Sequence, residues 1–178
     1  MLKVSEKLDP MAIRVVHKKF SDPQVRRSLF RLFQENVLCS MATVTTGSGA
    51  HVNIAYFAYS DDAEIFFYSY PDSQHSRNLS RNTSMAVSIF GSGQVWGKPD
   101  RGMQLFGKCK EPQGRFAARA ERTYCARFPE FKQWKENLKK EEGKFGLSPY
   151  RFAASRVKIL DEPEFGGGVF VIASLRGH

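Results

Sequence analysis

The sequence has few cysteines, and their spacing fits neither a disulfide framework nor a zinc site. Cys39, Cys109 and Cys125 are the only three in 178 residues, and no two of them form a C-x-x-C pair. A disulfide-stabilised secreted domain and a zinc-binding domain are therefore disfavoured, and we expect reduced, mostly buried thiols. The four histidines are never paired at a spacing of four residues, so the sequence predicts no metal site.

Long apolar runs and the common nucleotide-binding motifs are also missing. Residues 1–20 alternate charges with short apolar groups, so neither a membrane span nor a secretory signal is expected, and we expect a cytoplasmic protein. The chain has no G-x-x-x-x-G-K-[ST] run and no G-x-S-x-G run, which disfavours P-loop nucleotidases and serine hydrolases. The glycines at 91, 93 and 97 have the wrong spacing for a dinucleotide-binding turn.

The composition is sufficient for a large core. Hydrophobic residues make up 42% of the chain, and there are 15 phenylalanines. We expect one domain over residues 1–178, with an N-terminal extension at 1–19 and a helical insertion at 114–142.

The pattern of apolar residues predicts strands with two helical stretches. Helical spacing covers residues 20–36 and 115–144, and β-branched or alternating segments mark the strands. The expected strands are 37–46, 51–59, 63–70, 84–90, 101–110, 150–160 and 168–175. Strands in series with short turns favour a mainly β, α+β fold: a small closed antiparallel barrel with peripheral helices.

The most informative stretch is 66–82, where an apolar strand runs into a helix that begins with hydroxyl groups and a histidine. Asp72 or Ser73 can cap this helix, and Arg77 and Arg81 share one of its faces. The first N–H groups of a helix are unpaired and can bind an anion such as phosphate. The alternative is an ordinary capped surface helix.

Positive charge is concentrated elsewhere in the chain. Residues 98–160 carry a net charge of +9, including a helical run in which lysine, arginine and glutamate alternate. Alternating charges of this kind are typical of a solvated surface, although an anionic surface or nucleic acid could also bind there. We regard nucleic-acid binding as the less favoured alternative.

Taken in order, these motifs resemble the FMN-binding split barrels of the pyridoxamine 5′-phosphate oxidase-like family. The resemblance covers about residues 31–175. Within the family, the chain looks more like a largely uncharacterised bacterial branch than like the oxidase itself. It depends on the leading strand Cys39-Ser40-Met41-Ala42-Thr43-Val44, on Ser73-x-His75-x-x-Asn78-Leu79, and on Gly102-Met103-Gln104-Leu105-x-Gly107.

The resemblance implies a six- to seven-stranded Greek-key barrel that holds FMN at the interface of a two-fold homodimer. The flavin would then carry hydride or electrons for an oxidoreductase of unknown substrate, with no catalytic side chain assigned. The cofactor contacts carried over by position are Asn53, Ile54, Ala55 and Tyr56 on the second strand, Tyr68 and Ser69 on the third, Ser73, Gln74 and His75 at the helix start, and Gln104 on the fifth strand.

The sequence departs from the oxidase in its phosphate-binding cations. The oxidase has arginine or lysine at the positions of Asn53, Ala58, Gln74 and His75, and Arg77, Arg81 and Arg101 are the candidate substitutes. A deazaflavin- or haem-binding protein on the same barrel therefore stays open as an alternative. Arg176-Gly177-His178 matches the oxidase's late Arg-x-His spacing, but only at the chain terminus. Tyr56, Tyr70 and Trp96 are candidates for stacking or for lining a substrate pocket.

Overall fold

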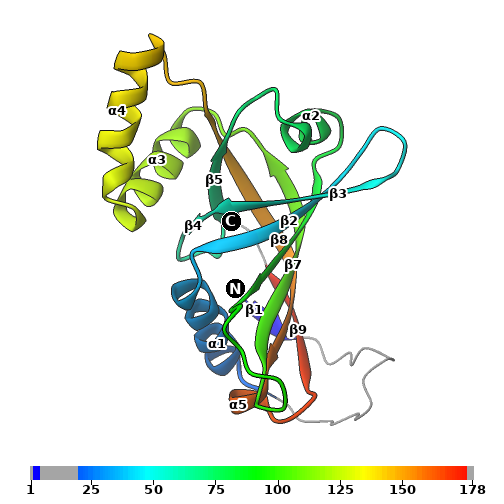
Figure 1. The fold of residues 1–178 in the computed structure, drawn as a ribbon. Helices are drawn as coiled ribbons and strands as arrows, with labels where there is room; N and C mark the ends of the chain where they lie inside the picture. Colours follow the sequence, from blue (N-terminus) through cyan, green and yellow to red (C-terminus); the bar gives the residue numbers. More distant parts are fainter. Residues whose placement is uncertain (1, 5–19, 176–178) are drawn as a thin grey trace.

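The strands form one antiparallel sheet that curls into a barrel (Figure 1). The computed structural model describes residues 2–4 and 20–175. The strands are β1 (Leu2–Val4), β2 (Leu38–Val44), β3 (Ala50–Tyr56), β4 (Ala58–Tyr59), β5 (Ile65–Ser69), β6 (Ser84–Phe90), β7 (Arg101–Lys110), β8 (Ser148–Asp161) and β9 (Phe170–Leu175). The helices are α1 (Asp22–Glu35), α2 (Gln74–Arg81), α3 (Arg115–Arg127), α4 (Glu130–Glu142) and α5 (Glu162–Phe165).

The pairing of strands returns to its starting point. β8 pairs with β5 through its first residues, with β7 along most of its length and with β9 through its last part. β7 then pairs with β6, β6 with β2, and β2 with β3. Directly after β3, the short strand β4 pairs with β5 through only two residues. Of the described strands, only β4 therefore closes the barrel on this side.

Alternation along the strands separates the core from the outer surface. Cys39, Met41 and Thr43 of β2 are buried, whereas the residues between them point outward. One continuous core fills the barrel and includes the fully buried Phe33 of α1 and Phe67 of β5. A period of two in the sequence was the basis for predicting these strands, and the predicted α+β class with an antiparallel barrel and peripheral helices is confirmed.

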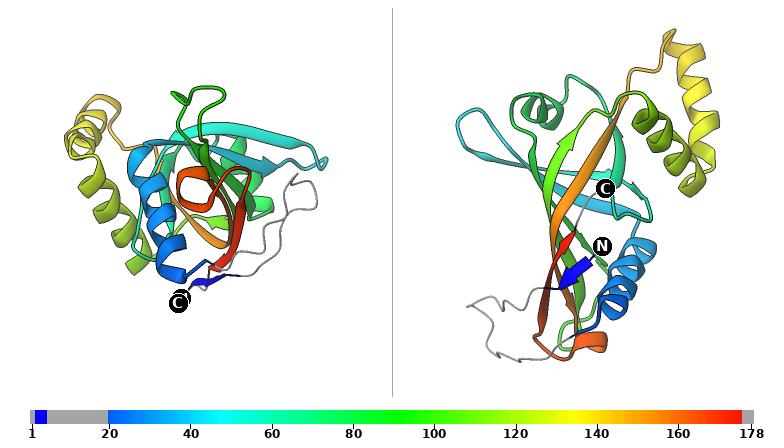
Figure 2. Two further views of the ribbon diagram at one scale, coloured as in Figure 1. Left: turned by 90° about the horizontal axis from the view of Figure 1, so that it is seen from below. Right: turned by 180° about the vertical axis from the view of Figure 1, so that it is seen from behind.

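Helix α1 packs against one end of the barrel. Its buried residues are Val25, Ser28, Leu29, Leu32 and Phe33, which follow the predicted helical spacing. The helix begins with a capping box, in which Ser21 and Gln24 bond each other's backbone N–H groups. Figure 2 shows α1 and α5 at this end of the barrel, and α3 and α4 as a separate pair outside the wall.

The helical stretch predicted at 115–144 is two helices. The break falls at Phe128 and Pro129, because proline has no backbone N–H to continue the first helix. The pair is held to β5 by a second, smaller apolar cluster. In that cluster Tyr68 packs on Tyr124 and Phe131, with ring centroids 5.0 and 4.6 Å away.

Other expectations differ in detail. Residues 2–4, which fall in the expected N-terminal extension, form β1 and pair with β9. The strand predicted at 51–59 is interrupted at the buried Phe57, and α5 was not predicted. All three cysteines are free, as predicted, and burial raises the pKa of Cys39 to about 12. Within the described residues, no helix is both long enough and apolar enough to span a membrane.

Candidate functional site

The predicted anion-binding helix is α2, and its first turn carries a hydrogen-bonded set of small polar side chains. Ser73, and not Asp72, is the N-cap: its Oγ accepts the N–H of Ser76 at 3.3 Å. The Nε2 atom of His75 lies 2.6 Å from Ser69 Oγ and 3.1 Å from Ser73 Oγ. Ser69 and Ser73 are themselves 3.2 Å apart. Three of the predicted cofactor contacts therefore come together.

A second imidazole joins this set from a different strand. His51 of β3 stacks on His75 with ring centroids 6.3 Å apart, and its Nδ1 is buried with no hydrogen-bond partner among the described residues. Burial and the neighbouring His51 lower the pKa of His75 below its ordinary value. We call Ser69, Ser73, His75 and His51 the α2 polar cluster. Sequence reasoning missed His51 because it stands in a strand with no local motif around it.

The α2 polar cluster lies beside an open strand edge. β3 pairs with β2 on one side, and none of the described strands pairs with its other side. Asn53, on the same face of β3 as His51, has a buried Oδ1 that bonds to none of the described residues. Buried polar atoms are nearly always hydrogen-bonded, so two unpaired ones next to an open edge indicate a place for a ligand or water.

The predicted contacts on β3 divide between two faces. Asn53 and Ala55 are half-buried on the face of the α2 polar cluster, whereas Ile54 and Tyr56 point outward and are 67% and 56% exposed. A ligand bound along this edge would contact the backbone of all four residues, but only the side chains of Asn53 and Ala55 or those of Ile54 and Tyr56. Tyr68 offers only its backbone, because its side chain packs against α3 and α4.

Gln104 lies far from the α2 polar cluster within one chain. It is exposed on the outer face of β7, paired with Ser88 of β6 and Lys158 of β8. Ser69 of β5 pairs with Ser148 at the start of β8, ten residues before Lys158, which is about 33 Å along the strand. The structure therefore does not bring Gln104 and His75 together in a single subunit.

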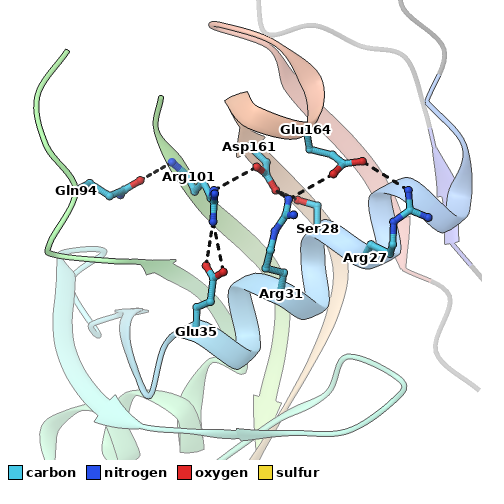
Figure 3. Close-up of polar contacts among 8 residues, drawn as sticks. All are labelled: Arg27, Ser28, Arg31, Glu35, Gln94, Arg101, Asp161 and Glu164. Carbon is cyan, nitrogen blue, oxygen red and sulfur yellow. Dashed lines mark hydrogen bonds and ion pairs between the residues drawn. The ribbon is translucent and has the colours of Figure 1, made fainter. Parts of the chain in front are cut away.

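The arginines considered as substitutes for phosphate-binding cations are engaged elsewhere. Arg77 donates to the carbonyl of Asp72 and to Gln74 Oε1, and Arg81 donates to Thr46 Oγ1 at 2.7 Å. Arg101 lies beside the buried Asp161 at the end of the barrel covered by α1 (Figure 3). Gln74 is also bonded within its helix, through its Nε2 to Asn78.

The outer surface of the sheet combines large exposed apolar side chains with a shallow groove. The exposed residues are Leu38, Val52, Ile54, Tyr56 and Phe90. A groove of about 270 Å³ on β2, β3, β6 and β7 lies near Val52, which pairs with Ala42, and small residues including Ala42, Ala50, Ala86 and Gly107 line it. Leu38, Tyr56 and Phe90 lie at the opposite ends of their strands. We call this surface the outer apolar face. Exposed apolar areas of this kind mark binding surfaces.

The aromatic candidates Tyr70 and Trp96 are both exposed. Tyr70 is 47% exposed, and Trp96 is 98% exposed on the loop between β6 and β7.

Many basic residues of segment 98–160 are paired with acids. Ion pairs join Arg119 to Asp62, Lys135 to Glu121 and Lys139 to Glu136. Arg151 is paired with the nearly buried Glu64. These pairs are spread over α3, α4 and β8, which weakens the case for a continuous anionic-partner surface.

A comparison with known families agrees with this architecture. The family model for pyridoxamine 5′-phosphate oxidase matches residues 26–160. The chain belongs to this family. The matched part of this pyridoxamine 5′-phosphate oxidase family member includes the α2 polar cluster, β3 and Gln104. None of the curated proteins matches the chain significantly.

Several solved structures share the fold at low sequence identity. A haem-binding protein from Mycobacterium smegmatis is 15% identical with a TM-score of 0.66; the match covers 88% of this chain and 59% of that protein. A protein of unknown function from Agrobacterium tumefaciens is 16% identical with a TM-score of 0.61, covering 82% of this chain and 60% of the other. HutZ, the haem storage protein of Vibrio cholerae, is 14% identical with a TM-score of 0.57, and the match covers 75% of this chain and 89% of HutZ. This chain thus spans less than two thirds of the first two proteins.

Proposed function

We propose that this family member binds FMN at the interface of a two-fold homodimer and acts as an oxidoreductase. The observation that carries the proposal is the open edge of β3 beside the α2 polar cluster, where His51 Nδ1 and Asn53 Oδ1 are buried without partners. An open strand edge supplies backbone N–H and C=O groups to a bound molecule. Hydroxyl and imidazole groups next to it can bond phosphate oxygens.

The residues present fit a flavin mononucleotide in the following arrangement. Ser69, Ser73 and His75 would hold the phosphate, and Asn53 to Tyr56 would face the ribityl chain and ring. When bound, the flavin supplies hydride or electron transfer, and the chain orients it and excludes water. Ala58, at a position where the oxidase has a phosphate-binding cation, cannot contact the phosphate here. It is fully buried in the small apolar cluster with Tyr124 and Phe131.

The second subunit would complete the site. The outer apolar face has a ridge on β3, formed by Val52, Ile54 and Tyr56, next to a groove of small residues. A two-fold axis places the ridge of each copy against the groove of the other, so the same surface serves both. Gln104 of the partner subunit, on this face, could then reach the flavin that Gln104 of the same chain cannot.

Haem is the second candidate ligand. Two proteins of the same fold are a haem-binding and a haem storage protein, and His51 Nδ1 is an imidazole nitrogen without a partner. Such a nitrogen is a common iron ligand.

The visible spectrum of the freshly purified protein tests the ligand. A flavin band in the blue, with FMN identified by mass spectrometry after release, is the expected result. A Soret band would favour haem, and a colourless protein that takes up neither molecule would overturn both assignments.

Two substitutions test the residues. We expect His75→Ala and Gln104→Ala each to retain less FMN, by about tenfold in affinity or more, because each removes one hydrogen bond to the cofactor. Gln113→Ala, in the exposed loop before α3, is the matched control. Full occupancy in both variants would show that these residues do not bind the cofactor.

The dimer has its own test. Ile54→Glu places a charge in the centre of the ridge on both copies, and we expect light scattering to report a monomer. Gln113→Glu makes the same change of charge away from the outer apolar face and should leave the dimer intact. A monomeric wild-type protein would contradict the shared site.

A further inference from the structure

The α2 polar cluster would hold a phosphate without any permanent positive charge. Its four members are two serines and two histidines, and the two arginines of α2 donate to other groups. Hydrogen bonds to a phosphate are about twice as strong when the donor is charged. In this cluster only the imidazoles can become charged at physiological pH.

We propose that a phosphate binds at the α2 polar cluster together with one proton, which the His51–His75 pair takes up from solvent. Affinity for a phosphate group then decreases as the pH rises. The inference rests on the proposed function for the location of the phosphate, and it assigns a binding role to His51.

The hydrogen-bond geometry shows where the proton would act. His75 Nε2 faces the hydroxyls of Ser69 and Ser73, and Ser73 already donates to Ser76 Oγ at 2.8 Å. In an imidazolium, Nε2 carries a hydrogen and donates it to Ser69 Oγ. The hydroxyl hydrogen of Ser69 is then free to be donated to a phosphate oxygen. A protonated His51 likewise gains a hydrogen on Nδ1, the atom that has no partner in the free chain.

The free chain disfavours a proton on His75. His75 is half-buried, so desolvation lowers its pKa, and a charge on the neighbouring His51 ring lowers it further. The ring of Phe67, on β5, also lies near His75, with centroids 6.4 Å apart. A phosphate dianion next to the two rings reverses this balance, because an opposite charge favours the protonated imidazole.

The other titratable and charged groups around the two histidines do not supply the positive charge for a bound phosphate. From β8, Tyr150 stacks on Phe67 with centroids 5.2 Å apart, and burial raises its pKa, so it stays neutral. Glu111, which follows β7, acts on Tyr150 and is not among the causes that shift the pKa of His75. From β2, Thr43 contributes a hydroxyl, which accepts from Asn78. On α2, the guanidinium of Arg77 is directed to Asp72 and Gln74.

The experiment compares FMN with riboflavin, which lacks the phosphate, across pH. Uptake of one proton predicts that the Kd for FMN rises about tenfold per pH unit above the histidine range. The phosphate itself is already a dianion there, since its second pKa is about 6. The Kd for riboflavin should stay constant. His75→Lys, which provides a permanent cation, should bind FMN with a flat pH profile.

A second measurement uses inorganic phosphate and needs no flavin. We expect the pKa values of the His51 and His75 rings, followed by NMR, to rise when phosphate is added to the wild-type protein. FMN that binds with the same Kd at all pH values would overturn the proton uptake but leave the proposed function standing. Phosphate that raises the imidazole pKa values while FMN and riboflavin fail to bind would support the proton uptake and overturn the flavin function. Unchanged imidazole pKa values with phosphate would overturn the inference.

Discussion

The two ends of the barrel both bury polar groups, but with opposite chemistry. At the end covered by α1, the fully buried Asp161 accepts from Ser28 Oγ at 2.6 Å and from Arg31. Arg101 lies 3.7 Å from the other carboxylate oxygen, and Glu164 lies 3.6 Å from Arg31 (Figure 3). We call these residues, together with Glu35 beside Arg101, the Asp161 cluster. At the other end, the α2 polar cluster contains only hydroxyls and imidazoles.

The difference indicates which end is structural and which can exchange partners. Burying a carboxylate without a partner costs several kcal/mol of stability. The Asp161 cluster therefore joins α1 to β8, and its ion pairs cannot be exchanged for those of a ligand without a large loss of stability. Neutral hydroxyl and imidazole groups can exchange the hydrogen bonds between them for hydrogen bonds to a ligand at little cost in free energy. The closed end therefore fixes the barrel, and the open end is suited to binding.

Breaking the closed end should have the largest effect. Asp161→Ala leaves the Arg31 guanidinium and Ser28 without their buried partner, and we expect a loss of about 3–5 kcal/mol in the free energy of unfolding in urea. Glu35→Ala removes a partly exposed partner of Arg101 from the same cluster and should cost no more than about 1 kcal/mol. Equal losses in the two variants would contradict a special role for the buried carboxylate.

The wall between the two ends should be the next most sensitive. At Gly107 the register of β7 against β8 shifts, and an added Cβ would lie 2.1 Å from the carbonyl oxygen of Ala153. Because the three nearest atoms all belong to the backbone of Ala153 and Ala154, Gly107→Ala should cost roughly 1–3 kcal/mol. Gly47→Ala, where a Cβ meets nothing within 4 Å, is the control and should change stability by less than about 0.5 kcal/mol. Similar melting temperatures for the two variants would show that the wall adapts.

The attachment of the open end to the sheet should have a smaller effect. Asn78 is buried, donates to Thr43 Oγ1 at 3.0 Å and accepts from Gln74 at 2.8 Å, so it joins α2 to β2. We expect Asn78→Ala to cost about 1–2 kcal/mol and to reduce FMN retention, because the start of α2 loosens. Ser80→Ala, on the exposed side of the helix, should change neither. Normal FMN retention in Asn78→Ala would show that α2 keeps its place without this link.

The smallest effect concerns the pH dependence of the ligand-free protein. The pKa of His75 is lowered in the folded chain, so the unfolded chain binds more protons near the ordinary histidine pKa of about 6.5. The free energy of unfolding therefore decreases as the pH falls through that value, and the loss stops below the folded pKa. Urea titrations at successive pH values measure this decrease, and His75→Gln should remove the part that comes from His75. A variant whose free energy of unfolding has the same pH dependence as the wild type would contradict this role of His75. Acid thus lowers the stability of the free chain while it favours the proposed binding of phosphate.

Several features of the fold could be predicted because they depend on local patterns. The strands at 84–90 and 101–110 have the predicted bounds, since alternation of apolar residues reports which face is buried. The helix α2 and its Ser73 cap follow from residues that are neighbours in the chain. The break at Pro129 carried a local signal as well, but the helical spacing on both sides of it concealed the interruption.

The candidate site could be predicted only in part. Ser69, Ser73 and His75 lie within seven residues, and the family resemblance predicted all three as contacts of one cofactor phosphate. His51 reaches them from β3, and Gln104 lies opposite Lys158, ten residues along β8 from Ser148, the partner of Ser69, which no local pattern reveals. The arginines proposed as phosphate ligands were plausible by spacing, but Arg101 is held at the far end of the barrel by Asp161, some 60 residues later in the chain.

By itself, the sequence determined the barrel's strands, the capped helix after β5 and the membership of a cofactor-binding family, because periodicity, capping and motif order act over short stretches of chain. The tertiary structure alone decided that two histidines lie against each other, that the nearby arginines are engaged elsewhere and that one edge of β3 pairs with none of the described strands. The reason is that each of these depends on which distant strands and helices the curvature of the sheet brings into contact.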